Sequence, residues 1–311
     1  MSSAGFLKRA RRATGVVSLL SIPLLAGVAC ARIEPTADVP PYETLLMLLA
    51  DFRRSAGVDL YRYEIPLDMT GQNAFRAALE RLDSFEKENP DAYGDVVDFT
   101  RGEARARLGD FRGAVEAFNR AAARSDSMLA AKASERAESL ARLDEAVQPA
   151  GSADRLADYL RNLERKQERL DALLESFGES PDAALARRER ERVDIEYALA
   201  LFRNRYVLEK GAAPALDFAA SMLERHAGSR LIYAHRLMLG RFYLELAHDL
   251  ADLTPPDRLD FDAALFSSLI DAARKQFLRV SQADGYAEKL EGAALLDAAE
   301  SLARKVRNLS R

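Results

Sequence analysis

The sequence is poor in the residues that build metal, redox and nucleophile sites. Its 311 residues include one cysteine and three histidines, and they contain no HExxH, CxxC, His-x-x-x-His or glycine-rich phosphate-binding motif. Zinc sites, disulfide frameworks and phosphate loops need those residues at those spacings. A G-x-S-x-G turn for a nucleophilic serine is also absent. We therefore expect a protein that is not an enzyme and holds no cofactor or metal. The three histidines are His226, His235 and His248, and the last two are interpreted as partly buried or surface residues rather than metal ligands.

Strand signals and chain breakers are scarce as well. Tryptophan is absent, glycine and proline number 16 and 11, and Ala, Leu, Arg and Glu dominate. This composition is typical of long helices. Residues 57–67 alternate like a strand, but Pro66 interrupts them, so we expect a loop or a brief extended segment there. The sequence predicts an all-α fold.

Charge of one sign is not concentrated anywhere in the body of the chain. The net charge is −4, and without the basic N-terminal residues 41 basic residues face 49 acidic ones. Such a balance argues against a nucleic-acid partner. Arginines in the runs ERKQER and ARRERERVD alternate with acidic residues. We interpret these runs as solvated helix faces with ion pairs between neighbouring turns.

The N-terminus has the order of a secretory signal. Lys8, Arg9, Arg11 and Arg12 precede an apolar stretch at 16–28. The stretch is too short, and too interrupted by serine and proline, for a comfortable membrane span. Residues 1–29 are therefore predicted to be a signal peptide that is removed on export.

The single cysteine follows this stretch directly. Gly27-Val28-Ala29-Cys30 resembles the lipobox of bacterial lipoproteins, although Gly27 stands where a branched residue is usual. The resemblance implies a lipid anchor on Cys30, with residues 30–41 as a polar, proline-bearing tether. A lone free thiol is otherwise a liability in an oxidising compartment. We expect a protein anchored at the outer membrane and facing the periplasm. The alternatives are an ordinary signal peptide cut near Ala29, which would leave a soluble periplasmic protein, and an uncleaved anchor.

Residues 95–121 (DVVDFTRGEARARLGDFRGAVEAFNRA) resemble a tetratricopeptide repeat, a helix hairpin of about 34 residues. The positions that carry the resemblance are Gly102, Gly109, Asp110, Phe111, Ala114, Phe118 and Ala121. In the repeat, the first glycine lets the two helices approach and the second makes the turn. Asp98, Arg101 and Arg105 depart from the pattern, so we expect the first helix to pack less typically or to face solvent.

A second match begins with Leu239-Gly240-x-x-Tyr243 and continues at Ala273-x-x-x-Phe277. Residues 251–266 intervene where a tight turn is usual. Thr254-Pro255-Pro256 must end the first helix, because proline cannot continue it. The insertion is expected to form either an elongated helix pair or a projecting lobe.

Weaker matches flank these two. We expect a first helix from about residue 194 to Tyr206 and a second helix that carries Ala215, Ala219 and Met222. Another second helix is expected to carry Ala78, Leu82 and Phe85. Residues 129–147 and 285–309 are predicted to be amphipathic helices that cap or bridge the repeats.

The middle of the chain breaks the repeat pattern. Apolar residues recur at heptad spacing, with Gln167 at one seam position. They are Leu156, Leu160, Leu163, Leu170, Leu174 and Phe177. Gly178 is expected to end this helix, and Ser180-Pro181 to begin the next. Residues 150–193 are therefore predicted to form a long antiparallel helical hairpin.

Together these features predict a helical-hairpin repeat solenoid, with N-terminal repeats in 42–149 and C-terminal repeats in 194–311. The tetratricopeptide resemblance implies a concave groove that holds peptides or helices of other envelope proteins. The expected groove residues are Phe99, Glu103, Arg107, Asn204, Arg241 and Glu245. Arg107 and Arg241 are candidates to hold a carboxylate or backbone carbonyls, with Phe99 as an apolar anchor. We expect an adaptor or scaffold at the cell envelope. The alternative is a permanent structural subunit of an envelope assembly or export complex.

Overall fold

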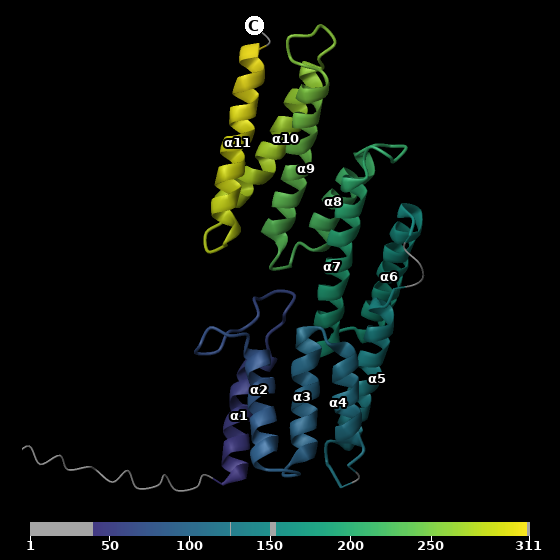
Figure 1. Ribbon diagram of the computed structural model, residues 1–311, viewed down its shortest axis with the longest axis vertical. Helices are drawn as coiled ribbons and strands as arrows, with labels where there is room; N and C mark the ends of the chain where they lie inside the picture. Colours follow the sequence, from purple (N-terminus) through teal and green to yellow (C-terminus); the bar gives the residue numbers. More distant parts are fainter. Residues whose placement is uncertain (1–39, 125, 150–153, 310–311) are drawn as a thin grey trace, which may run out of the picture. The chain divides into compact units, whose positions relative to one another are not determined.

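The computed structural model describes residues 40–124, 126–149 and 154–309, and within them the fold is all-α (Figure 1). The described part contains 11 helices and no strand. The helices are α1 (Pro41–Ala56), α2 (Ala74–Glu88), α3 (Gly94–Leu108), α4 (Phe111–Ala122), α5 (Ala130–Val147), α6 (Leu156–Phe177), α7 (Pro181–Arg203), α8 (Ala213–Arg225), α9 (Ile232–Leu253), α10 (Ala263–Ser281) and α11 (Glu288–Leu309). The predicted signal peptide, Cys30 and most of the tether lie outside the described residues. None of the described helices is long and apolar enough to cross a membrane.

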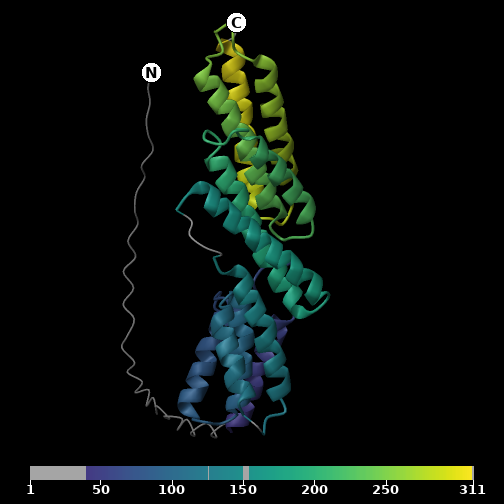
Figure 2. The same ribbon diagram turned by 90° about the vertical axis from the view of Figure 1, so that its right-hand side faces the viewer.

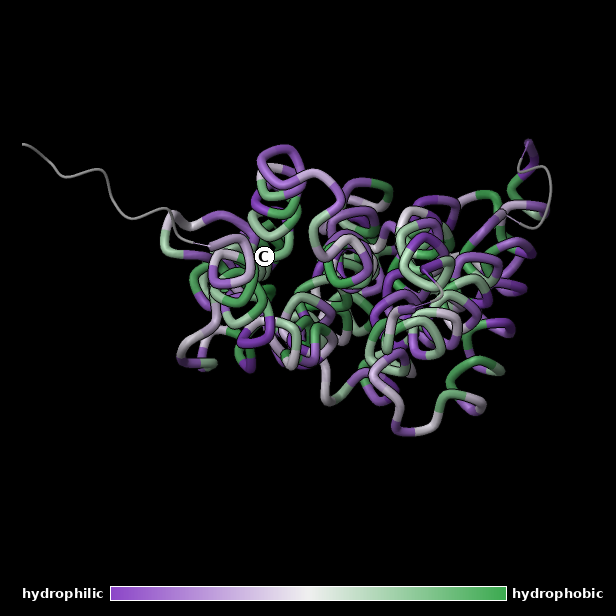
Figure 3. Tube along the Cα trace, turned by 90° about the horizontal axis from the view of Figure 1, so that it is seen from below, coloured by the Kyte–Doolittle hydropathy of each residue, from purple (hydrophilic) through white to green (hydrophobic). Residues whose placement is uncertain are grey.

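Each helix packs against the next one along the chain, from α1 to α11. Further contacts skip a single helix and join α1 to α3, α3 to α5, α5 to α7, and α9 to α11. Figures 1 and 2 show α9, α10 and α11 side by side from two directions. Several helices seen end-on in Figure 3 carry both hydrophobic and hydrophilic residues, as expected when a helix buries one face against its neighbours.

A glycine sets the spacing between α3 and α4. A Cβ atom on Gly102 would lie 2.8 Å from the ring of Phe118, which is fully buried. Gly109 has a φ of +84° and ends α3, because a left-handed conformation there is open to glycine. The Asp110 side chain then accepts a hydrogen bond from the Gly113 amide at 3.0 Å and begins α4. These roles confirm the expected helix hairpin at 95–121.

The same arrangement recurs between α9 and α10. A Cβ atom on Gly240 would lie 2.5 Å from the ring of Phe277, which is also fully buried. Thr254 terminates α9 ahead of the two prolines, as expected. Because α9 has 22 residues and α10 has 19, the predicted insertion is an elongated helix pair joined by residues 254–262.

In the middle of the chain, α6 and α7 form a hairpin with a three-residue turn. Gly178 ends α6 at a φ of +54°, and Ser180 and Pro181 begin α7, as the sequence indicates. The predicted boundary at residue 193 is wrong, because α7 continues to Arg203. Tyr206 therefore lies in the turn after α7, largely exposed, and the expectation of a helix reaching it is also wrong.

Charged residues are buried on two helices, α3 and α7. On α3, Asp98 and Arg101 are 3 % and 7 % exposed, because Arg101 lies against α2 and pairs with Asp83 and Glu86 at 2.8 and 2.9 Å. On α7, the ARRERERVD run includes four buried charged residues, Glu189, Arg190, Glu191 and Asp194. The interpretation of this run as a solvated face is wrong, because α7 is enclosed by α5, α6 and α8.

Candidate functional site

Three of the expected groove residues lie together on α3. Phe99 is partly buried and packs edge-on against Phe118, with ring centroids 5.1 Å apart. Glu103 and Arg107 form an ion pair at 2.5 Å. The Arg107 guanidinium also donates two hydrogen bonds to the carbonyl oxygen of Ala56, at 2.6 and 3.1 Å. Arg107 therefore does hold a backbone carbonyl, but the carbonyl belongs to the end of α1.

The other three expected residues lie near α9. Arg241 forms an ion pair with Glu291 of α11. Glu245 is exposed and lies 3.8 Å from Arg205, whereas the Asn204 side chain donates to the Ala200 carbonyl at 2.8 Å and closes α7. Since α3 packs on α2, α4 and α5, and α9 packs on α8, α10 and α11, the structure does not gather the six residues into one site. Their role in binding a partner stays a prediction.

Asp194 is the centre of a buried polar cluster that the sequence reasoning missed. Its carboxylate is fully buried and accepts hydrogen bonds from four side chains. They are Gln167 at 2.8 Å, Arg190, Arg225 at 2.6 Å and His226 at 2.9 Å. The donors come from α6, α7, α8 and the turn after α8. This cluster ties together four consecutive parts of the chain.

His226 connects the cluster to the loop after α1. Its Nδ1 atom lies 3.0 Å from the hydroxyl of Tyr61, and its Nε2 atom faces Asp194. Burial lowers the pKa of His226 to about 4, with Arg225 and Arg190 acting in the same direction and Glu191 opposing them. A neutral ring then donates from Nε2 to Asp194 and accepts from Tyr61. Burial likewise raises the pKa of Tyr61 to about 12.

A second buried histidine lies beside the first. His235 Nε2 is 2.6 Å from a carboxylate oxygen of Glu191, and the two imidazole rings are 6.0 Å apart. His226 and His235 are 3 % and 2 % exposed, so His235 is more deeply buried than expected, while His248 is exposed. In the described residues, no group of three or more His, Cys, Asp or Glu side chains could hold a metal ion. The cluster is suited to holding helices in place.

An open surface feature is a groove between α1 and α2. Two adjoining cavities of about 280 and 490 Å³ share Leu48, Asp51 and Arg81. We call them together the α1–α2 groove. Its walls come from α1, α2 and the connecting loop, and its apolar lining is Met47, Leu48, Phe52, Leu67, Met69, Ala74, Ala77, Ala78 and Phe85. Apolar walls of this kind with a few polar groups are typical of binding sites.

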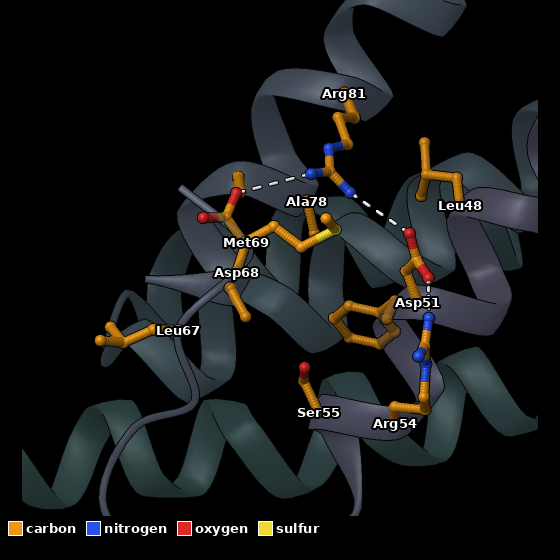
Figure 4. Close-up of a pocket in the computed structure, with 12 residues that line it drawn as sticks. Leu48, Asp51, Arg54, Ser55, Leu67, Asp68, Met69, Ala78 and Arg81 are labelled. Atoms are coloured by element: carbon orange, nitrogen blue, oxygen red, sulfur yellow. Dashed lines mark hydrogen bonds and ion pairs between the residues drawn. The ribbon is translucent and has the colours of Figure 1, made fainter. Parts of the chain in front are cut away.

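Charged residues border this groove. Arg81 of α2 lies between Asp51 and Asp68 and contacts both, at 3.4 and 3.5 Å (Figure 4). A hydrogen bond from the Thr70 hydroxyl lowers the pKa of Asp68 and keeps it ionised. The lining includes four carboxylates, on Asp51, Asp68, Glu80 and Glu88, against two guanidiniums, on Arg54 and Arg81. The groove border is therefore acidic.

Large apolar side chains are exposed on and beside the groove. Leu46 and Met47 are each 59 % exposed, and Met69 is fully exposed. A signal for this surface is present in the sequence, because residues 45–49 are five consecutive apolar residues. Such a run covers more of a helix than one buried stripe requires.

No protein-family model matches this chain, and no curated protein is significantly similar to it.

Proposed function

We propose that this chain is a tetratricopeptide-like helical-hairpin repeat protein that acts as an adaptor at the bacterial cell envelope. The observation that carries the proposal is the α1–α2 groove, which has apolar walls and the exposed methionines Met47 and Met69. The repeat assignment is supported by the glycine–phenylalanine contact that α3–α4 and α9–α10 share. It is also supported by contacts that link each helix to the next one or two along the chain.

The occupant that the groove suits best is a basic amphipathic helix of another protein. Met47, Leu48 and Met69 offer flexible apolar contacts, and methionine adapts well to varied partner side chains. The acidic border favours lysine or arginine on the flanks of the bound helix. Helix-in-groove recognition works in this way, with the apolar face buried and the charged flanks at the edge.

Placement at the envelope rests on the sequence. We propose that Cys30 carries the lipid anchor and that residues 30–41 form the tether. Because α1 begins at Pro41, the α1–α2 groove lies on the first helices after that tether. Anchoring would restrict the adaptor to the membrane surface and raise the local concentration of any partner there.

Site-specific photocrosslinking in intact cells tests the adaptor function. A photoreactive residue replaces Met69 in the groove in one strain and Leu259 in the α9–α10 connection in another, since both side chains are fully exposed. We expect a defined adduct from position 69 that position 259 does not give. Met47→Glu should weaken that adduct at least several-fold, because it adds a carboxylate to an apolar wall already bordered by acids. Identical adducts from both positions, or no effect of Met47→Glu, would contradict the proposal.

A second function, as a permanent structural subunit of an envelope assembly or export complex, is favoured by one observation. Tyr42 and Leu46 extend the exposed apolar surface of α1 beyond the groove, and terminal helices of repeat arrays normally carry a polar outer face. A permanent subunit would keep its crosslinked partner through dilution and size-exclusion chromatography. An adaptor would release it.

A further inference from the structure

A separate cavity of about 350 Å³ lies where α7 begins. Its walls come from the loop after α1, from α3 and α5, and from the first turns of α7. Val58, Leu60 and Leu185 are among its apolar lining residues, and Arg107, Arg136 and Arg187 bring three guanidiniums to it. Its volume falls in the range of small-molecule sites.

Two of the three arginines are balanced by carboxylates of the chain itself. Glu103 accepts hydrogen bonds from both Arg107 and Arg136, at 2.5 and 2.7 Å. Asp182 forms a further ion pair with Arg136. Together the two arginines and two carboxylates are neutral, and these contacts lower the pKa of Glu103 despite its burial. These ion pairs hold the side chains of Arg107 and Arg136 in place at the cavity.

Arg187 differs, because no carboxylate of the described residues lies within ion-pair distance of it. Its Nε atom is buried without a hydrogen-bond partner, and so is the Oγ atom of Ser180, which also lines the cavity. The Arg187 guanidinium lies 6.0 Å from the centroid of the Tyr61 ring. A buried polar atom without a partner in a native fold calls for an explanation such as an absent ion or ligand. Among the described residues, Arg187 is therefore the cavity arginine without an ion pair within 4 Å.

The remaining charged groups of the cavity are not ion-pair partners of Arg187. Asp59 accepts a hydrogen bond from the Tyr61 amide at 3.0 Å and faces Arg62 at 3.6 Å. Glu179 is exposed in the turn before α7. The Ser180 side chain makes no capping bond to α7, so its hydroxyl is available to donate a hydrogen bond to a bound anion.

We propose that this cavity binds a small aliphatic monocarboxylate, with its carboxylate on Arg187 and its hydrocarbon body against Val58, Leu60 and Leu185. A single carboxylate neutralises the single unpaired guanidinium and matches its planar fork. The apolar walls favour an alkyl chain over a highly hydrated phosphate. This site is distinct from the α1–α2 groove and does not depend on the function proposed for it.

Calorimetric titration with pentanoate tests the site, using the chain without the predicted signal peptide (residues 1–29). Pentanamide serves as the uncharged ligand of similar size. We expect binding of pentanoate and a loss of about ten- to hundred-fold in affinity with Arg187→Gln, the range of a hydrogen bond to a charged group. Pentanamide should bind as weakly as pentanoate binds to that variant. Arg203→Gln is the matched control, because Arg203 is an exposed arginine at the far end of the same helix.

Circular dichroism and the unfolding midpoint establish that each variant is folded. Should Arg187→Gln fail to fold, Arg187→Lys keeps the charge but removes the planar fork, and it should bind pentanoate several-fold more weakly. Glu179→Gln should tighten binding, because it removes a carboxylate from the cavity wall. Equal affinity for acid and amide, or unchanged affinity in the folded Arg187 variant, would overturn the proposal.

Discussion

At the scale of single residues, the buried cluster around Asp194 shows how this protein tolerates charges in its interior. Asp194 is fully buried, yet its two oxygens accept four hydrogen bonds, two of them from groups on later parts of the chain. Arg190 also donates a hydrogen bond from its Nε atom to the Asp171 carboxylate, at 2.7 Å. A buried ion pair stabilises a fold only when its remaining hydrogen-bonding atoms are also satisfied. The Asp194 carboxylate meets that condition.

Stability should fall in mildly acidic solution because of His226. Burial lowers the pKa of His226 to about 4 in the native state, whereas its pKa is near 6.5 in the unfolded chain. Between these values the unfolded chain binds a proton that the native protein does not, so the free energy of unfolding decreases as the pH falls. The contribution is fully present above pH 6.5, and about 2 kcal/mol of it should be lost by pH 5.

Urea denaturation at pH 7.5 and pH 5 checks this expectation. His226→Gln removes the titrating group and should reduce the difference between the two pH values. His248→Gln serves as the control, since His248 is exposed and should leave the difference unchanged. An equal loss of stability on acidification in wild type and His226→Gln would show that His226 is not the cause.

At the scale of helices, the two glycine contacts control how closely paired helices approach. Replacing Gly240 or Gly102 with alanine places a methyl group 2.5 or 2.8 Å from a buried phenylalanine ring. Overpacking of this kind typically costs about 1–3 kcal/mol, which exceeds the gain of about 1 kcal/mol in helix propensity. We expect both variants to be less stable, with the larger loss for Gly240→Ala, as measured by thermal or chemical unfolding.

Gly57→Ala provides the comparison. Gly57 follows α1 at a φ of −77°, and a Cβ atom there would meet nothing within 4 Å. This substitution should be neutral or slightly stabilising. If Gly240→Ala were as stable as Gly57→Ala, the close approach of α9 and α10 would not depend on the glycine.

The positions of most helices and several of their ends could be predicted from the sequence, because local signals determine them. Gly109, Gly178 and the Ser180-Pro181 pair each mark a helix end in the sequence and in the structure. The glycine–phenylalanine pairs are also local, since they join helices that are adjacent along the chain. Hydrophobic periodicity and capping residues are enough to predict helix ends and contacts between helices that are adjacent in sequence.

The burial of α7 could not be predicted in the same way. Its sequence is dense in charge and has hardly any apolar stripe, which is typical of a solvated helix. The hydrogen-bond partners of Asp194 and Glu191 include Arg225, His226 and His235, which follow 31 to 44 residues later in the chain. Pairing over such separations leaves no periodic signal. For the same reason, the sequence does not indicate that Arg187 lacks an ion-pair partner.

At the scale of the whole molecule, contacts between neighbours along the chain imply that stability is distributed in segments. Buried apolar residues of α9, α10 and α11 form one cluster that includes Phe277, whereas Phe118 belongs to a different cluster that spans α1 to α7. In arrays of this type each segment is stabilised mainly by the segments next to it. Distant segments are expected to open separately.

Hydrogen exchange of two cavity-forming variants measures this independence. Phe277→Ala should cost about 3–5 kcal/mol and reduce amide protection in α9, α10 and α11, while α3 and α4 remain protected. Phe118→Ala should give the reverse pattern. A uniform loss of protection along the chain in either variant would indicate one cooperative unit instead.

The Asp194 cluster also constrains the order in which the chain can fold. Gln167 and Arg190 belong to the α6–α7 hairpin itself, but Arg225 and His226 follow Asp194 by 31 and 32 residues. Until the end of α8 has docked, the Asp194 carboxylate keeps part of its hydration shell, because removing that shell without all the partners is costly. Complete burial of α7 therefore requires α8 and the turn after it. A chain shortened before residue 225 would leave this face of the hairpin hydrated.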